Sequence, residues 1–249
     1  MPDQYAEGVI GRKWVFCPFL QQKDTHDLIR TCQVCSQFLL YCCPCNKRFG
    51  NDGRGPDGGF CHHYRVIFTD GACRQQGNEG ATAGIGFACG EEDVWQGSLP
   101  VDDDVDPGAR RTSQRAELLA ALEGLKYMIM IDRVNNGDAD RERKGKKKCH
   151  GGKFKMRNSN EDTSWIIATD SQYVVQGMTE WLPAWKDNHL RTNRNTKPAN
   201  LDLFLKLDEA LSAEEAFQKV KIGFWYIPRK YNSIADGLAK KASLDGEPA

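Results

Sequence analysis

The sequence has no apolar stretch approaching the roughly 20 residues that a helix needs to cross a bilayer. It also lacks an excess of charge, because 34 Lys and Arg residues balance 34 Asp and Glu residues. Residues 1–7 contain neither a basic start nor an apolar run. These absences predict an intracellular soluble protein without membrane contact, and nothing chooses between nucleus, cytoplasm and mitochondrion. Any nucleic-acid surface must come from local clusters of charge.

Cysteine is plentiful, and most of the ten cysteines lie in the first quarter of the chain. Their Cys-x-x-Cys spacing in a reducing compartment favours metal binding over a disulfide framework. Two such pairs could form one tetrahedral four-cysteine zinc site, made of Cys32, Cys35, Cys42 and Cys45. Further ligand candidates flank them, namely Cys17, Cys61, His62 and His63. Buried or redox-prone thiols are the alternative.

The chain divides by composition into residues 1–63, a Cys-rich N-terminal segment, and residues 64–245, which carry the remaining motifs. Residues 51–59, rich in Gly, Asp and Pro, have the composition of a linker. An insertion at about 134–163 is basic, and its composition predicts disorder, although a tether for nucleic acid is an alternative. Residues 102–106, four of them Asp, predict a solvated loop without fixed geometry.

The stretch from Arg65 to Ala72 organises the larger part of the chain. Val66, Ile67 and Phe68 form a short run of β-branched and aromatic residues, which suits a strand buried on both faces. Gly71 ends this predicted strand and leaves Asp70 at its mouth. An acidic residue at a strand end usually satisfies local backbone donors, so a functional role depends on partners.

Three carboxylates downstream have settings that can direct them to that strand. Glu117 lies in the first turns of a predicted helix, whose apolar residues from Leu118 to Ile129 follow helical spacing. Asp170 ends a second buried strand, and Asp236 opens a C-terminal helix. Clustered carboxylates repel one another unless a cation lies among them, and Mg²⁺ prefers oxygen ligands and phosphate oxygens. Two such ions about 3.5–4 Å apart can assist phosphodiester hydrolysis, so the pattern predicts a nuclease site.

The four motifs, in order, resemble those of type 1 ribonuclease H. They are Thr69-Asp70-Gly71-Ala72, Gln114-Arg115-Ala116-Glu117-Leu118, Thr169-Asp170-Ser171 and Ile234-Ala235-Asp236-Gly237-Leu238-Ala239. The resemblance covers about residues 64–243 and implies that Asp70 bridges two Mg²⁺ ions, for which Mn²⁺ can substitute. It implies that Asp236 helps to hold the ion nearer the attacking water, and that Glu117 and Asp170 hold the other.

The resemblance also implies contacts to an RNA/DNA hybrid. Arg110, Thr112 and Asn200 would hold a DNA phosphate, and Ser113, Gln114 and Gln76 would lie near the hybrid. Trp181, Trp185 and the polar loop that contains Asn193 resemble the family's basic protrusion, where rings pack on sugars and bases. Ordinary core packing of the tryptophans and helix capping by Asn200 are the alternatives.

Two departures from the family are visible. No stretch resembles the N-terminal hybrid-binding module of many eukaryotic members, and the Cys-rich segment either replaces its role or extends the fold. Many members place a His in the loop before the last helix, where this chain has the short sequence Pro228-Arg229-Lys230. Arg229 and Lys230 are the nearest polar substitutes, which implies an altered rate rather than lost activity.

The sequence therefore predicts an α/β protein of ribonuclease H-like fold, with a five-stranded mixed sheet, its first three strands antiparallel, and helices on both faces. The predicted function is endonucleolytic hydrolysis of RNA in RNA/DNA hybrids by a monomer, leaving 5′-phosphate and 3′-hydroxyl ends. A related nuclease acting on DNA and a non-catalytic hybrid-binding protein are the alternatives. Clustered acids argue against the last, because negative charge next to phosphates weakens binding.

Overall fold

A computed structural model of the chain describes residues 7–43, 45–46, 60–76, 80–137 and 163–246. The strands are β1 (Gly8–Ile10), β2 (Lys13–Val15), β3 (Ile29–Thr31), β4 (Phe38–Leu40), β5 (Tyr64–Arg74), β6 (Thr82–Ala88), β7 (Gln96–Pro100), β8 (Ser164–Thr169) and β9 (Lys221–Tyr226). The α-helices are α1 (Pro18–Gln21), α2 (Thr25–Leu28), α4 (Ser113–Gly137), α5 (Gln172–Gln176), α6 (Leu182–Asp187), α7 (Leu201–Gln218) and α8 (Ser233–Asp245). A π-helix, η4 (Gly177–Trp181), joins α5 to α6, and short 3-10 turns are η1 (Asp93–Trp95) and η5 (Arg229–Tyr231).

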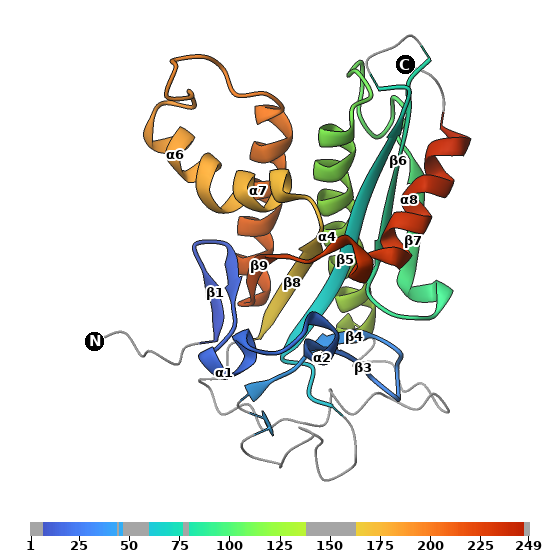
Figure 1. The fold of residues 1–249 in the computed structure, drawn as a ribbon, viewed down its shortest axis with the longest axis vertical. Coiled ribbons are helices and arrows are strands. Elements are labelled where there is room, and N and C mark those ends of the chain that lie inside the picture. The colour runs from blue at the N-terminus through green and yellow to red at the C-terminus, as the bar shows by residue number, and fades with distance from the viewer. Residues whose placement is uncertain (1–6, 44, 47–59, 77–79, 138–162, 247–249) are drawn as a thin grey trace.

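These strands form one mixed sheet (Figure 1). Its centre is the predicted five-stranded arrangement, in which β5, β6 and β7 are antiparallel while β8 and β9 run parallel to β5. The predicted count of five is too low, because the N-terminal segment adds four strands and the sheet has nine strands among the described residues. β2 pairs with the free edge of β9, and β4 pairs with the beginning of β5 through Leu39 and Arg65.

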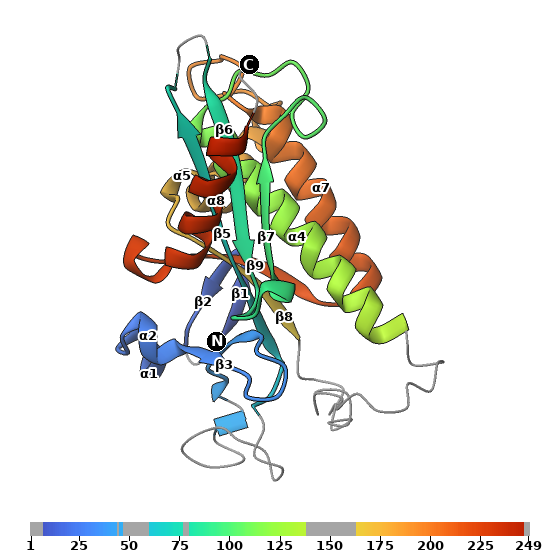
Figure 2. The ribbon, with the colours of Figure 1, turned by 90° about the vertical axis from the view of Figure 1, so that its right-hand side faces the viewer.

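Helices cover both faces of the sheet, as predicted (Figure 2). Successive residues of a strand point to opposite faces. Ile67 and Ile167 therefore join the core beneath α4 and α7, whereas Val66, Phe68 and Ile166 join a second core on the side of α8. The N-terminal segment supplies much of that second core, with Trp14, Phe16, Leu20, Leu28, Phe38 and Leu40. The Cys-rich segment is thus a structural part of the fold and covers one face of the central strands.

Helix α8 packs directly on β6, because glycine lets the two backbones approach. A Cβ at Gly86 would lie 2.4 Å from the carbonyl oxygen of Ala235 and 2.5 Å from the amide nitrogen of Ala239. Any side chain at Gly86 would therefore push α8 away from the sheet. This contact fixes where the first turn of α8, which carries Asp236, lies relative to β5.

The insertion was predicted to begin at about residue 134, but residues 134–137 are the last residues of helix α4. The remainder of the insertion, 138–162, and the predicted linker at 51–59 lie outside the described residues. Within the described part of the chain, none of the helices is long and apolar enough to cross a membrane.

Candidate active site

Asp70 lies inside β5 rather than at its end. The strand continues to Arg74, and Asp70 pairs with Gly86 of β6. On the other edge of β5, pairing with β8 stops at Phe68 and Ala168, so Asp70 lies just beyond the last paired residue. Asp70 is only 3% exposed to solvent. Asp70 therefore lies where β5 continues past the end of its pairing with β8.

Gly71 brings α4 against this part of β5. A Cβ at Gly71 would lie 2.2 Å from the carbonyl carbon of Ala116 and 2.3 Å from the amide nitrogen of Glu117. No other residue type fits such a distance without moving the helix. The first turns of α4 therefore lie directly on β5, and Glu117 comes into the neighbourhood of Asp70.

Asp170 follows β8, where Ser171 caps the next helix by accepting a hydrogen bond from the amide of Val174. The side chain of Asn232 lies beside Asp170, and Asn232 is almost fully buried. Its Nδ2 donates to Asp170 Oδ1 at 2.7 Å and to the carbonyl oxygen of Thr69 at 3.0 Å. Because Asn232 directly precedes α8, this one amide ties together the elements that carry Asp70, Asp170 and Asp236.

Proximity of the four carboxylates is visible in their electrostatics. Burial, followed by the charges of Asp170 and Asp236, raises the pKa of Asp70 to about 7. Burial, followed by the charges of Asp70 and Asp170, raises the pKa of Glu117 to about 9. Each shift is caused partly by other members of the set, so the fold has gathered carboxylates from β5, α4, β8 and α8 into one electrostatic neighbourhood.

Two cations lie at the rim of the set. Arg229 forms a hydrogen bond with Asp236, and its guanidinium lies 3.8 Å from Asp170 Oδ2. Lys240 Nζ lies 2.6 Å from Asp236 Oδ2, one helical turn away. Although burial opposes the effect, the hydrogen bonds from Lys240 and Arg229 lower the pKa of Asp236. Asp236 is therefore ionised while Asp70 and Glu117 hold protons more tightly.

The donor set suits a hard divalent cation. All four groups are carboxylates, and Glu117 Oε2 is buried without a hydrogen-bond partner. In the described residues, no three of these carboxylates bring oxygens within 4.8 Å of one another. Mg²⁺ commonly takes one or two carboxylates and completes its shell with water and phosphate oxygens, so a site of paired carboxylates fits it.

The residues predicted to contact a hybrid near α4 lie at its N-terminus. Thr112 Oγ1 accepts a hydrogen bond from the amide of Arg115, and Ser113 Oγ donates to Gln76 Oε1 at 2.7 Å. Arg110 and Gln114 are exposed. The start of a helix offers backbone N–H groups to anions, so this region has the chemistry of a phosphate contact.

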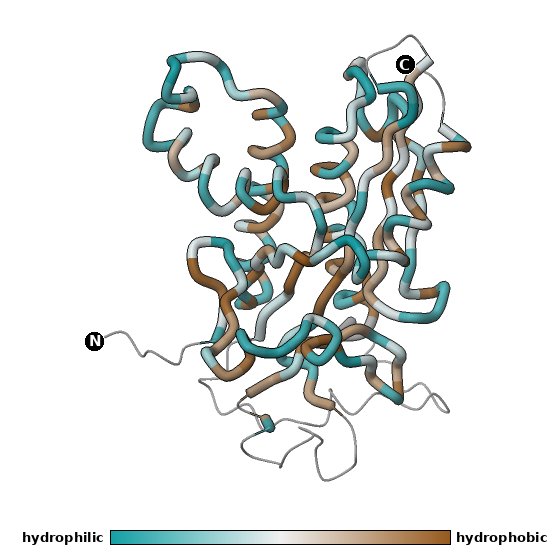
Figure 3. The backbone as a smooth tube through the Cα atoms, viewed as in Figure 1, coloured by the Kyte–Doolittle hydropathy of each residue, from teal (hydrophilic) through white to brown (hydrophobic). Residues whose placement is uncertain are grey.

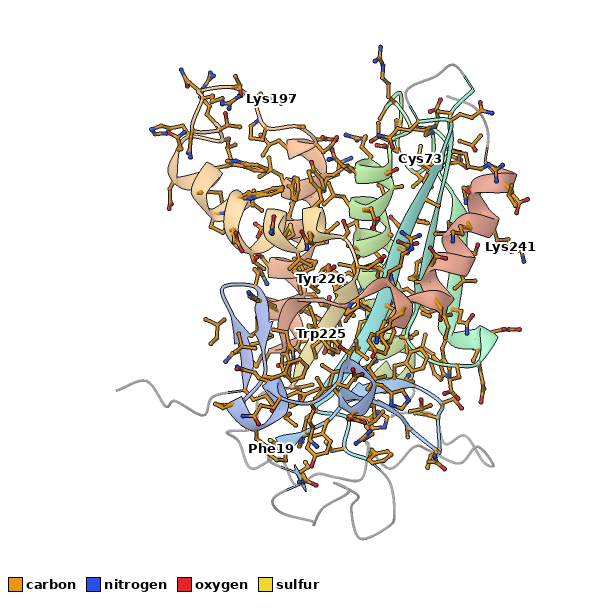
Figure 4. All side chains as sticks on the ribbon, in the orientation of Figure 1. Phe19, Cys73, Lys197, Trp225, Tyr226 and Lys241 are labelled. Carbon is orange, nitrogen blue, oxygen red and sulfur yellow. The ribbon has the colours of Figure 1, made fainter. Side chains whose placement is uncertain are left out.

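The predicted protrusion spans η4, α6 and the loop to α7. Trp181 and Trp185 are half-buried, with ring centroids 6.2 Å apart, and Trp185 packs edge-on against Phe204 of α7. Trp185 thus packs against the core, as the alternative held for it, whereas Trp181 contacts the rings of Tyr173 and Trp185. The following loop is largely hydrophilic (Figure 3) and includes the exposed Asn193. It also includes the exposed Lys197, which is labelled in Figure 4.

Asn200 occupies the N-cap position of α7, yet its side chain makes no capping bond. Its Nδ2 donates to the hydroxyl of Tyr173 at 3.0 Å, and its Oδ1 accepts from Arg115 at 3.3 Å. Arg115 also pairs with Asp106 and Asp202 at 2.7 and 2.8 Å. Asn200 is therefore held between α4, α5 and α7 rather than used as a cap.

The acidic loop was expected to be solvated and irregular, and this prediction is wrong in part. Asp106 is buried and meets Arg115 through two hydrogen bonds of 2.7 Å, while Asp103 pairs with the buried Arg111. The paired arginines lie elsewhere in the sequence, so charge composition alone could not reveal them. Asn232 was also missed, although a polar residue directly before a helix is a recognisable signal for a structural contact.

The predicted single four-cysteine cluster does not form. One group contains Cys42 and Cys45 with Cys61 and His63, and another contains Cys32 and Cys35 with His62. The two Cys-x-x-Cys pairs therefore belong to different groups, because β4 and its flanking turns separate them. A third group contains Glu7, Cys17 and Cys43.

Comparison with known proteins gives consistent matches. The RNase H family profile matches residues 155–244. The chain is 30% identical over 179 residues to Ribonuclease H of Pseudomonas entomophila, covering 70% of this chain and 90% of that protein. It is 26% identical to Ribonuclease H1 of Mus musculus over 73% of this chain and 51% of that protein, so it spans about half the length of this relative. The crystal structure of LC11-RNase H1 in complex with RNA/DNA hybrid is 20% identical, with a TM-score of 0.44 over 72% of this chain and 96% of that one.

Proposed function

Because the chain belongs to the ribonuclease H family, we propose that it hydrolyses the RNA strand of RNA/DNA hybrids endonucleolytically. The products would be 5′-phosphate and 3′-hydroxyl ends. The observation that carries this proposal is the convergence of Asp70, Glu117, Asp170 and Asp236. The Asn232 amide joins Asp170 to β5, Gly71 seats the start of α4 on β5, and Arg229 contacts both Asp170 and Asp236. The raised pKa values of Asp70 and Glu117 agree with this placement. A nucleic-acid-binding surface gains nothing from concentrated negative charge, whereas a magnesium-dependent nuclease requires it.

The four carboxylates would hold two Mg²⁺ ions, with Mn²⁺ as a substitute. By the family resemblance, Asp70 would serve both ions, Asp236 would help to hold one, and Glu117 and Asp170 would hold the other. The charges of Asp170 and Asp236 both act on Asp70, and the charge of Asp70 acts on Glu117, which agrees with a shared position for Asp70. When bound, the ions would supply charge stabilisation to the attacking and leaving oxygens of the phosphodiester.

The chain's own residues would prepare this site. Asn232 orients Asp170 with a charge-assisted hydrogen bond and anchors it to the backbone of β5. Arg229 and Lys240 keep Asp236 ionised. Arg229 also lies on the exposed side of the set, where its guanidinium would meet a substrate phosphate. This position supports its predicted role in turnover.

Two neighbouring groups of residues would contact the hybrid. Arg110, Thr112 and Asn200 would contact a phosphate of the DNA strand, with Ser113, Gln114 and Gln76 near the hybrid. The exposed parts of Trp181 and Trp185 and the polar Asn193 would support the DNA strand by stacking and polar contacts. Tyr173 connects the two groups, because it accepts a hydrogen bond from Asn200 and packs against Trp181. Selectivity for RNA would come from its 2′-hydroxyl, which Glu117 could read. All four carboxylates come from one chain, so a monomer suffices.

Cleavage of a labelled RNA/DNA hybrid under Mg²⁺, compared with duplex DNA and duplex RNA, tests the proposal. We expect cuts only in the RNA strand of the hybrid, and only with Mg²⁺ or Mn²⁺. Asp70→Asn should bind the hybrid with similar affinity and not cut it, because it removes a charged metal ligand while keeping the side chain's shape.

The same assay separates the alternatives. Cleavage of duplex DNA at a comparable rate would support a DNA nuclease of the same fold, because such an enzyme has no use for a 2′-hydroxyl. Hybrid binding by wild type without cleavage under either ion would support a non-catalytic binding protein. Either result would refute the ribonuclease assignment.

A further inference from the structure

The Cys-rich segment contains two groups of soft ligands that the proposed nuclease activity does not use. In the first, Cys42, Cys45, Cys61 and His63 bring one ligand atom each to within 4.8 Å of all the others. In the second, Cys32, Cys35 and His62 do the same. Each group combines one Cys-x-x-Cys pair with one of two adjacent histidines. This division assigns every cysteine of the two motifs to a group with nitrogen as well as sulfur ligands.

The distances within the groups match a tetrahedral metal site. Zn–S bonds of about 2.3 Å and Zn–N bonds of about 2.0–2.1 Å at tetrahedral angles place sulfur and nitrogen roughly 3.6 Å apart. In the first group, His63 Nδ1 lies 3.7 Å from Cys42 Sγ and 3.3 Å from Cys45 Sγ. In the second, His62 Nε2 lies 3.4 Å from Cys32 Sγ and 3.9 Å from Cys35 Sγ.

One ring nitrogen thus faces two sulfurs in each group. A single N–H or lone pair can make one good hydrogen bond at a time, whereas a central cation can bind all the ligand atoms at once. No disulfide joins the described cysteines of either group. Thiolate and imidazole together favour Zn²⁺ over the hard cations expected at the carboxylates.

We propose that the segment binds two zinc ions, a closed one at Cys42, Cys45, Cys61 and His63 and a second at Cys32, Cys35 and His62. The first has the four protein ligands of a structural site. The second has three described ligands and a fourth position for water or another donor. The adjacent histidines join the two sites, because His62 faces Cys32 and Cys35 whereas His63 faces Cys42 and Cys45.

The location gives these ions a structural role. Cys32 and Cys35 lie between β3 and β4, Cys42 and Cys45 follow β4, and His63 directly precedes β5, at the lower end of the sheet in Figure 1. The ions would therefore connect the hairpin of β3 and β4 to the start of β5, the strand that carries Asp70. Removing them would loosen the segment that covers Val66 and Phe68.

Metal analysis of the full chain purified without added zinc tests this proposal. Wild type should contain about two equivalents of zinc, and Cys45→Ser and Cys35→Ser should each retain about one. His63→Ala should lose one equivalent, whereas His63→Cys should keep it, because a thiolate can replace the imidazole. Cys73→Ser is the matched control and should keep both ions, because the Cys73 thiol lies near the other end of β5, where it donates to the carbonyl of Arg111. Asp70→Asn, measured alongside, shows whether the carboxylates contribute any zinc.

A second measurement on wild type guards against variants that fail to fold. X-ray absorption at the zinc edge should find between two and three sulfur ligands per zinc on average, with nitrogen or oxygen completing the shell. Four sulfurs per zinc, or one equivalent that both Cys35→Ser and Cys45→Ser abolish, would instead establish a single shared four-cysteine site and overturn the proposal. Less than half an equivalent in wild type would overturn it outright. A chelator should lower the Tm of wild type and leave Cys35→Ser/Cys45→Ser less affected.

Discussion

Replacing Asn232 with alanine should damage both the stability of the fold and the activity of the site. The Asn232 side chain is almost fully buried and makes two hydrogen bonds through one nitrogen, to Asp170 Oδ1 at 2.7 Å and to the Thr69 carbonyl at 3.0 Å. The first is to an ionisable carboxyl and contributes about 1.5–3 kcal/mol, and the second is neutral and contributes about 0.5–1.5 kcal/mol. Asn232→Ala should therefore lower the free energy of unfolding by about 2–4.5 kcal/mol.

The same substitution should weaken magnesium use. With Asn232 absent, the Asp170 side chain loses its hydrogen bond to the amide and keeps the looser contact with Arg229 at 3.8 Å, so the ligand loses its fixed orientation. Loss of a group that orients a metal ligand typically costs about 10–100-fold in metal affinity or activity. Asn232→Ala should raise the Mg²⁺ concentration for half-maximal cleavage and lower kcat, both by about tenfold or more.

Asn232→Asp and Asn188→Ala complete the test. The aspartate keeps the shape but replaces the donor with an acceptor beside Asp170, so it should be at least as damaging as alanine. Asn188 also donates two hydrogen bonds through Nδ2, but it is exposed in the loop after α6, and its loss should change little. Urea unfolding and a Mg²⁺ titration of cleavage measure these effects. An Asn232→Ala protein with wild-type stability and Mg²⁺ dependence would refute the reasoning.

Three further outcomes are expected. Gly71→Ala should abolish most of the cleavage activity and lower the free energy of unfolding by about 1–3 kcal/mol, because the added Cβ would lie 2.2 Å from the backbone of Ala116. If the variant cleaved at the wild-type rate, α4 would be able to shift without harm. Arg229→Ala should slow turnover while leaving hybrid binding nearly intact, and it should lower the half-saturating Mg²⁺ concentration because a competing cation is gone; unchanged turnover would remove Arg229 from the mechanism. Mg²⁺ should raise the Tm more at pH 9 than at pH 6, as scanning calorimetry can measure. The pKa values of about 7 for Asp70 and about 9 for Glu117 lie above the ordinary 3.8 and 4.5. The metal-free fold therefore loses stability as the pH rises from these ordinary values through the raised ones, and ion binding restores it. A rise in Tm with Mg²⁺ that is the same at both pH values would contradict this account.

Much of the fold follows from local patterns in the sequence. Continuous apolar runs predicted β5 and β8, and the helical spacing after Glu117 predicted α4. The end of β5 was mispredicted, because Gly71 was taken as a strand terminator. Its actual role is close contact with Ala116, which depends on a helix more than forty residues away. A glycine signals permissive backbone in the sequence, but only its neighbours reveal which use is made of it.

The N-terminal segment shows the same limit. Its short strands have no alternation long enough to predict, so the sheet was expected to have five strands rather than nine. The segment's aromatic and aliphatic residues pack against Val66 and Phe68, and that long-range contact makes the strands form. Asp106 and Arg115 illustrate the point for charges, since their pairing needs the loop to fold back on α4.

By itself, the sequence determined which chemistry is available: four carboxylates in motif order, two Cys-x-x-Cys pairs and two adjacent histidines, each with the local structure that presents it. Only the tertiary structure decided how they are grouped. It tied Asp170 to β5 through Asn232, and it divided the cysteines between His62 and His63. The physical reason is range, because secondary structure follows from neighbouring residues, whereas a ligand set depends on atoms that packing brings together across the chain.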